Sequence, residues 1–147
     1  MKDVPGWPRI SSSLCYDQPL EAIDWLCRAF GFEVRIKIVG ESGRLEHSEL
    51  TFGDGVVMVG AQKPEIARWE YRKPPRALSG ANTQNLFVYV DDVEAHCARA
   101  RAAGAAIVRE LETVDYGPDY WSDRGYEARD IGGHHWFFAQ RLRTRAP

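Results

Sequence analysis

The chain has 147 residues, a length that fits one domain with a substantial hydrophobic core. Charged residues make up 27% of the sequence and the net charge is −2, which argues against a general nucleic-acid or membrane-surface binder. No apolar run approaches the roughly 20 residues that a membrane-spanning helix needs. Cys15, Cys27 and Cys97 are widely spaced and the first residues carry no secretory signal, so we expect a reduced, cytoplasmic protein.

A strand, a helix and three further strands are predicted in residues 9–62. Residues 9–16 form the first strand, and a helix follows to Phe30, with Pro19 in its first turn and Gly31 after its last residue. The next strands are "FEVRIKIV", "RLEHSELTF" and "VVMVGAQ", with a turn at "GDG" before the last. Their alternation and β-branched residues favour extended structure.

The same order of elements is predicted again in residues 84–140. The strand "NLFVYV" precedes a helix over residues 92–103, which Asp91 or Asp92 caps and Gly104 ends. The strands "AAIVREL", "YWSDRGYEARD" and "HHWFFAQ" complete this copy. Between the copies, residues 63–83 contain three prolines and form a linker or a short helix with a loop. The basic tail "RLRTR" is expected to be a solvated terminus.

This repeat predicts an α+β fold in which two tandem βαβββ modules form a cupped mixed β-sheet around one cavity. The modules belong to a single domain over residues 1–147 and pair either within one chain or across a dimer. Leu50 and Phe52 require the helix-covered face, so His47 and Glu49, of opposite parity, should face the concave side. The same rule gives the concave face of the second module Asn85, Phe87 and Tyr89.

The pair His47 and Glu49 is the leading polar candidate for chemistry. At positions i and i+2 of a strand they point the same way, so Glu49 can hold His47 as a base or hydrogen-bond donor. The alternative is a solvated or interface strand face. Asn85 can donate to and accept from a polar ligand group, or it can simply end a strand by bonding to backbone.

A mostly apolar pocket with a few polar points is typical of small-molecule sites. Ser11, Ser13 and Cys15 share one strand face and supply polar points, although Cys15 is better explained as a structural cysteine. The loop "YGPDYW" contains Tyr120 and Trp121 and is the candidate rim of the pocket. Packing in the core or in a dimer explains at least half of the aromatic residues.

Four segments carry a resemblance to a known family: "LCYDQPLEAIDWLCRAFGFEV", "HSELTFGDGVVMV", "FVYVDDVEAHCARARAAGAAIV" and "YEARDIGGHHWFF". In order and spacing they resemble the glyoxalase/bleomycin-resistance protein/dioxygenase superfamily, also called the vicinal oxygen chelate (VOC) superfamily. The likeness covers nearly all of residues 9–140. It implies paired βαβββ modules and commonly a homodimer.

Metal-dependent members of this superfamily take one ligand from the first and fourth strands of each module. The resemblance places those positions at Ser11, Met58, Asn85 and Phe137. Ser and Asn coordinate weakly, Met is soft and Phe has no donor atom. We therefore predict no metal and no other cofactor, and a divalent ion only if these positions are misplaced.

Three functions fit these observations. The first is a metal-independent protein that binds or sequesters a planar or aromatic compound, with Ser11, Ser13, Met58, Phe87 and Phe137 among the ligand contacts. The second is an enzyme, an isomerase or lyase acting on a small carbonyl or epoxide substrate through His47 and Glu49. The third is a regulatory or interaction module with a closed cavity. The expected partners are a small molecule and a second copy of the chain, with no nucleic acid and no membrane.

Overall fold

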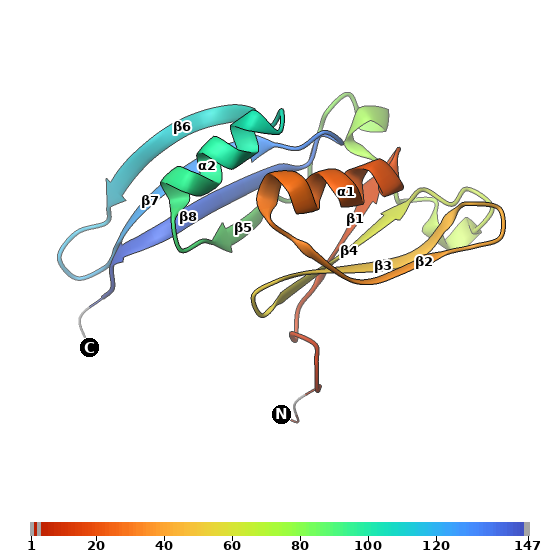
Figure 1. Cartoon of the computed structure of the whole chain (residues 1–147), viewed down its shortest axis with the longest axis horizontal. Helices are drawn as coiled ribbons and strands as arrows, with labels where there is room; N and C mark the ends of the chain where they lie inside the picture. The colour runs from red at the N-terminus through yellow and green to blue at the C-terminus, as the bar shows by residue number, and fades with distance from the viewer. Residues whose placement is uncertain (1, 3, 146–147) are drawn as a thin grey trace. The chain divides into compact units, whose positions relative to one another are not determined.

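The computed structural model describes residue 2 and residues 4–145, which divide into two compact units, Met1–Ala81 and Asn82–Pro147. The first unit contains four strands and one α-helix (Figure 1). Its elements are β1 (Ser12–Tyr16), α1 (Pro19–Phe30), β2 (Glu33–Val39), β3 (Leu45–Phe52) and β4 (Gly55–Ala61). The strand order is β1-β4-β3-β2, with β1 parallel to β4 and the other pairs antiparallel.

The second unit repeats this arrangement. Its elements are β5 (Leu86–Tyr89), α2 (Val93–Ala102), β6 (Ala106–Asp115), β7 (Ser122–Arg129) and β8 (His135–Arg143). The strand order is β5-β8-β7-β6, and β5 is parallel to β8. Two short 3₁₀ helices, η1 (Ala67–Trp69) and η2 (Pro75–Leu78), lie in the segment after β4. The predicted α+β class with two βαβββ modules is confirmed, and each module forms a four-stranded mixed sheet.

Both α-helices begin and end where local chemistry favours it. Pro19 occupies the first turn of α1, where its missing N–H costs nothing, and Gly31 ends the helix in the left-handed conformation with φ 83°. Asp92 caps α2 by accepting a hydrogen bond from the backbone N–H of Ala95 at 3.0 Å. These signals explain why the helix boundaries were predictable to within a residue or two.

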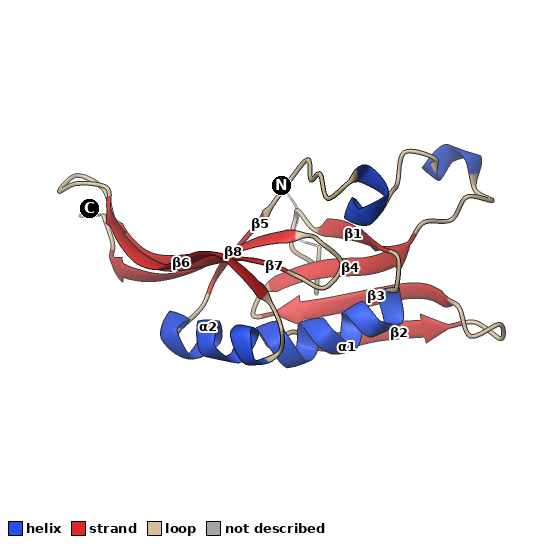
Figure 2. Cartoon of the chain, turned by 90° about the horizontal axis from the view of Figure 1, so that it is seen from above, coloured by secondary structure: helices blue, strands red, loops and turns tan. Residues whose placement is uncertain are grey.

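In each unit the helix covers one face of the sheet (Figure 2). In the first unit Leu14, Leu50 and Val59 are at most 2% exposed and supply the core beneath α1. In the second unit the rings of Tyr126 and Phe138 are fully buried against His96 of α2, whose Nδ1 lies 2.7 Å from the Tyr126 hydroxyl. Alternate residues of every strand therefore face away from the helix.

A β-bulge interrupts the alternation in β2. Val34 pairs with Leu50, but Ile36 pairs with Glu49, so Arg35 is an additional residue on this strand. The bulge brings the Arg35 side chain onto the same face as Ile36 and Glu49. Strict alternation along residues 34–39, as the sequence predicts, would have placed Arg35 and Ile36 on opposite faces.

The turn between β7 and β8 is organised by one buried carboxylate. Asp130, 6% exposed, accepts hydrogen bonds from the backbone N–H groups of Gly132 and His134 and from the indole N–H of Trp136, each at 2.9 Å. Gly133 adopts φ 94° within this turn, a conformation that favours glycine. Because Asp130 joins the turn to the first buried ring of β8, it sets the register of β8 against β7.

The tail "RLRTR" departs from the expectation of a solvated terminus. β8 continues to Arg143, since Asp123 pairs with Arg141 and Ser122 with Arg143 in the antiparallel ladder. The Arg143 guanidinium also reaches the Asp115 carboxylate at 2.6 Å. Ion pairs from β7 and the end of β6 therefore hold this segment in the sheet, although its basic composition predicted a solvated terminus.

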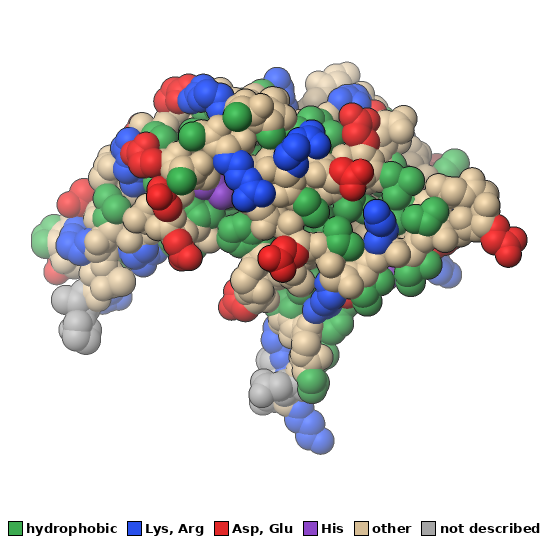
Figure 3. Space-filling view, viewed as in Figure 1, with side chains coloured by type: hydrophobic (Ala, Val, Ile, Leu, Met, Phe, Trp, Pro, Cys, Tyr) green, Lys and Arg blue, Asp and Glu red, His purple; other side chains and the backbone are tan. Residues whose placement is uncertain are grey.

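Within the described residues, no helix is long and apolar enough to cross a membrane. On the face seen in Figure 3, basic and acidic side chains lie interspersed and do not gather by sign. This distribution is in keeping with the small net charge of −2.

Gly125 of β7 is required by close packing and not by its backbone angles. A Cβ atom there would lie 2.7 Å from the carbonyl oxygen of Phe138 and 3.2 Å from the Phe137 ring. We expect Gly125→Ala to lower the free energy of unfolding by about 1–3 kcal/mol, measured by urea denaturation. Gly60→Ala in β4 is the matched control, because its nearest contact would be Arg72 at an ordinary 3.5 Å. Equal stabilities of the two variants would contradict this packing argument.

Candidate functional site

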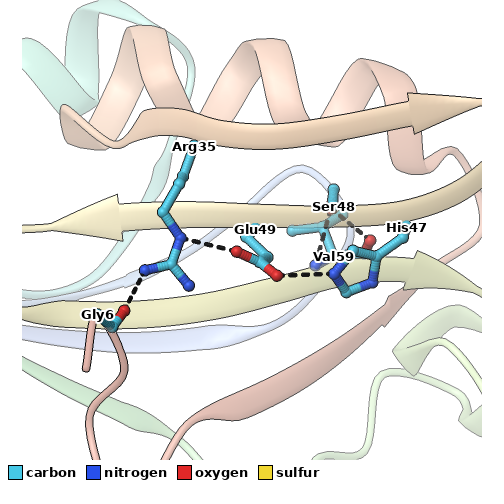
Figure 4. Close-up of polar contacts among 6 residues, drawn as sticks. All are labelled: Gly6, Arg35, His47, Ser48, Glu49 and Val59. Carbon is cyan, nitrogen blue, oxygen red and sulfur yellow. Dashed lines mark hydrogen bonds and ion pairs between the residues drawn. The ribbon is translucent and has the colours of Figure 1, made fainter. Parts of the chain in front are cut away.

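The open face of the first sheet, the one that α1 does not cover, carries a hydrogen-bonded row of three charged or polar side chains. Figure 4 shows Glu49 between Arg35 and His47. Arg35 Nε donates to Glu49 Oε2 at 2.7 Å, and His47 Nε2 lies 2.9 Å from Glu49 Oε1. The Glu49 side chain is only 7% exposed, whereas that of His47 is 43% exposed. Glu49 is thus a buried anchor, and His47 presents its ring to solvent.

This environment keeps Glu49 ionised. The hydrogen bond with His47 first, and the hydrogen bond and charge of Arg35 next, lower the pKa of the Glu49 carboxyl below its ordinary value, against the opposing effect of burial. An ionised carboxylate at Nε2 orients the imidazole and favours a proton on that nitrogen. The arrangement suits His47 to accept a proton or a hydrogen bond through its other ring nitrogen.

The segment before β1 completes the anchor. The Arg35 guanidinium donates to the carbonyl oxygen of Gly6, and its carbon lies 4.5 Å from the centroid of the Trp7 ring. Beneath this face, the Ser48 hydroxyl donates to the carbonyl of Val59 at 2.6 Å and accepts from its N–H at 3.1 Å. Both contacts hold β3 against β4.

The three polar residues expected on one face of β1 differ in their positions. Ser13 lies directly opposite Met58 on β4, so these two side chains are neighbours on the open face. Ser11 precedes β1, and its Oγ is buried without a hydrogen-bond partner among the described residues. Cys15 is 7% exposed, and burial raises the pKa of its thiol even though Arg72 acts to lower it. A buried, protonated thiol fits a structural role.

Aromatic rings cover the open face of the second sheet. Phe87 on β5 pairs with Phe137 on β8, and their rings stack with centroids 4.7 Å apart and planes inclined by 14°. Tyr89 meets Phe87 edge-on at 5.0 Å. Phe87 is 53% and Tyr89 47% exposed, an unusual amount for two adjacent rings on a sheet. The exposed rings of Phe87 and Tyr89 and the partly buried ring of Phe137 form an apolar aromatic cluster, called the platform below.

Two arginines border this platform, and carboxylates neutralise both. Arg109 lies over the Phe137 ring at 4.8 Å and pairs with Glu127 at 3.0 Å. Arg141 lies over the Tyr89 ring at 4.9 Å and pairs with Asp123 at 2.5 Å. Burial first, then the hydrogen bond to Asp123, raise the pKa of the Tyr89 phenol, so it stays neutral at physiological pH. The platform therefore offers stacking and phenol chemistry with little net charge.

The remaining predicted contacts lie around this platform to different degrees. Trp121 lies next to Arg141, whose guanidinium carbon is 5.2 Å from the indole centroid. Tyr120 is 51% exposed and touches Trp121 edge-on at 6.0 Å. Asn85 precedes β5 and is exposed, with Phe87 rather than Asn85 beside Phe137. Of the predicted residues, the strand members lie on the open faces of their sheets, and four lie outside the strands: Ser11, Asn85, Tyr120 and Trp121.

The positions implied for a metal do not suit one. The described residues hold no group of three or more His, Cys, Asp or Glu side chains able to bind an ion together. Met58 offers a thioether beside the hydroxyl of Ser13, and Phe137 offers a ring already stacked on Phe87. A thioether, a neutral hydroxyl and a phenyl ring do not make the set of carboxylate, carbonyl or imidazole donors that hard divalent ions require.

Sequence reasoning missed four charged residues that shape these faces. Arg35 was missed because only a bulge brings it to Glu49, and Arg141 because it was assigned to a solvated tail. Arg109 and Asp123 lie in predicted strands, but their spacing in the sequence does not indicate that Arg109 contacts an aromatic ring or that Asp123 forms an ion pair. The one signal in the sequence was the alternation of charges along "DRGYEARD", which could have predicted cross-strand ion pairs with the arginines of "RLR".

Acidification should reveal the Glu49 anchor. Because its pKa is lowered in the folded state, the carboxylate stabilises the fold above the unfolded pKa of about 4.3, and this contribution is lost as pH falls through the lower folded value. We therefore expect the stability difference between wild type and Glu49→Gln to shrink as pH falls from neutral into this range. Urea denaturation at several pH values measures it, with exposed Glu70→Gln as control. A difference independent of pH would argue against the anchor.

Comparisons with known proteins agree with this geometry. A family model described as the Glyoxalase/Bleomycin resistance protein/Dioxygenase superfamily matches residues 10–138. An uncharacterized protein of Mycobacterium bovis is 30% identical over 136 residues, which cover 92% of this chain and 85% of the relative. An uncharacterized protein of Mycobacterium tuberculosis strain H37Rv is 30% identical over 136 residues, covering 92% of this chain and 76% of the relative.

Solved structures give the same result. TioX from Micromonospora sp. ML1 is 32% identical with a TM-score of 0.67, and the match covers 90% of this chain and 95% of that one. TnmS3, described as an antibiotic binding protein from Streptomyces sp. CB03234, is 18% identical with a TM-score of 0.57, covering 89% and 93%. The second likeness shows the fold alone. Because the family model spans both βαβββ modules, the chain belongs to the Glyoxalase/Bleomycin resistance protein/Dioxygenase superfamily.

Proposed function

We propose that this protein binds a small planar or aromatic compound and recognises it through side chains on the open sheet faces without a bound metal. The observation that carries the proposal is the ring of Phe87, which is 53% exposed and stacked on Phe137, with the exposed Tyr89 beside it. Exposed aromatic rings cost free energy in water, and a flat ligand that packs on them removes that cost. Phe137 stands at a strand position where metal-dependent relatives would need a donor atom.

The chemistry of the platform narrows the ligand further. Its two guanidinium groups are already neutralised by Asp123 and Glu127, so stacking and the neutral Tyr89 phenol dominate recognition there. One solved structure with this fold is described as an antibiotic binding protein, a function in keeping with such a surface. At 18% identity that structure says nothing about the ligand of this chain, and the proposal depends on the rings.

A second candidate is an enzyme acting on a small carbonyl or epoxide substrate, and the His47–Glu49 contact of 2.9 Å favours it. A histidine held by an ionised carboxylate and open to solvent has the geometry of a general base. Such an isomerase or lyase would turn over a substrate and lose that turnover in His47→Ala. Binding of planar compounds without turnover, unchanged in His47→Ala, would support the binding protein instead.

We expect planar aromatic compounds such as acridine and anthraquinone to raise the melting temperature, because a ligand of the native state stabilises it by mass action. Phe87→Leu should weaken binding about two- to tenfold, the effect of one aromatic contact. Fluorescence titration gives the affinities. Tyr71→Leu is the matched control, since Tyr71 is 79% exposed and lies outside the platform. Binding that is equally strong in Phe87→Leu would remove the platform from the site.

We also expect a homodimer. β2 ends the strand order of its sheet, and four of its apolar residues are each at least 38% exposed: Val34, Ile36, Ile38 and Val39. An apolar edge strand of this kind is stabilised by a symmetric partner. Sedimentation at micromolar concentration should show a dimer that Ile38→Glu weakens at least about tenfold. Glu41→Lys, in the following turn, is the control. A wild-type monomer at this concentration would contradict the expectation.

A further inference from the structure

The segment after β4 places a guanidinium on the open face of the first sheet. Arg72 Nη2 donates to the hydroxyl of Ser13 on β1 at 3.0 Å. The same nitrogen lies 3.5 Å from where a Cβ on Gly60 would be, so the group lies along the β1–β4 pair. Ser13 is also the neighbour of Met58 in the ladder. A positive charge therefore lies beside Ser13 and Met58 on this face.

This guanidinium differs in its partner from the arginines that form ion pairs. Eight arginines of the described residues pair with carboxylates: Arg35, Arg44, Arg76, Arg101, Arg109, Arg124, Arg141 and Arg143. Arg72 is half-buried, yet no carboxylate of the described chain lies within ion-pair distance of it, and its hydrogen bond goes to a neutral hydroxyl. A partly desolvated charge with most of its donors unused binds an anion with two oxygens well.

The surroundings of Arg72 increase the positive potential. Its guanidinium carbon lies 5.6 Å from the centroid of the Trp69 ring, and Arg68 lies 5.4 Å from the same centroid, also with no carboxylate partner in the described part of the chain. Lys63, at 5.6 Å from that ring, pairs weakly with Glu46 at 3.8 Å. The local excess of positive charge is therefore unbalanced, and Trp69 adds a flat surface beside it.

We infer that Arg72, together with the Ser13 hydroxyl, binds the oxyanion group of a small compound, a carboxylate or a phosphate, on the open face of the first sheet. The inference goes beyond the proposed function, because it assigns an anion site to the first unit, with the Trp69 ring beside it for a planar body. The guanidinium donates in parallel to two oxygens, and the Ser13 hydroxyl, released from Arg72, donates to one of them. Arg72 supplies a positive charge without a carboxylate partner on this face, where the described residues hold no group of acidic, His or Cys side chains able to bind a metal.

A matched pair of probes tests this assignment. 2-Naphthoate and 2-naphthamide have the same planar ring system and differ in charge. We expect wild type to bind naphthoate about tenfold more tightly than naphthamide in calorimetric titration, because the carboxylate accepts a charge-assisted pair of hydrogen bonds. This preference should decline as the sodium chloride concentration is raised. Arg72→Gln should abolish the preference and leave naphthamide binding unchanged, and Arg72→Lys should retain part of it. Arg76→Gln is the control, because Arg76 pairs with Asp17 instead.

Inorganic phosphate separates the two proposals, with melting temperatures confirming that each variant folds. If both naphthalenes bind wild type equally, or if Arg72→Gln keeps the preference, the oxyanion assignment is wrong and the aromatic site stands. If neither naphthalene binds but phosphate raises the melting temperature in wild type and not in Arg72→Gln, the oxyanion site stands and the aromatic proposal is wrong. Failure of all three probes would overturn both.

Discussion

In the described part of the chain one α-helix covers one face of each sheet, and the rest of the structure follows from that constraint. The buried alternate residues, such as Leu50 in one unit and Phe138 in the other, pack against the helix and form the core. The helix does not cover the opposite residues, so most of them are polar, paired or exposed. The side chains that a ligand can reach therefore lie mainly on the open faces, by the same rule that builds the fold.

The two open faces have the same strand order but differ in the side chains that the helix leaves uncovered. The first buries one carboxylate, Glu49, and surrounds it with His47 and Arg35, while Arg72 contributes a charge with no acidic partner in the described chain. The second uses rings and keeps its charges in neutral pairs.

Strand parity and helix ends were predictable because they depend on local rules. The burial of Leu50 and the helix caps at Gly31 and Asp92 could be predicted from residue spacing and local propensity alone. The site was less predictable, because its partners come from bulges and strand register. Arg35 reaches Glu49 because β2 contains one extra residue at the bulge. Arg141 pairs with Asp123 in the β-ladder, but the basic composition around it predicted a solvated tail. Such contacts are long-range, and single-sequence patterns do not encode them.

The pairing of the first strand with the last in each module has a consequence for how such a protein changes over time. Ser13 and Met58 are distant in sequence yet adjacent in the ladder, as are Phe87 and Phe137. None of these four side chains belongs to the helix-covered core, so a substitution at any of them costs less folding free energy than one in the core. A scaffold built this way is evolvable, because substitutions on two neighbouring strands change the recognition chemistry while the backbone stays the same.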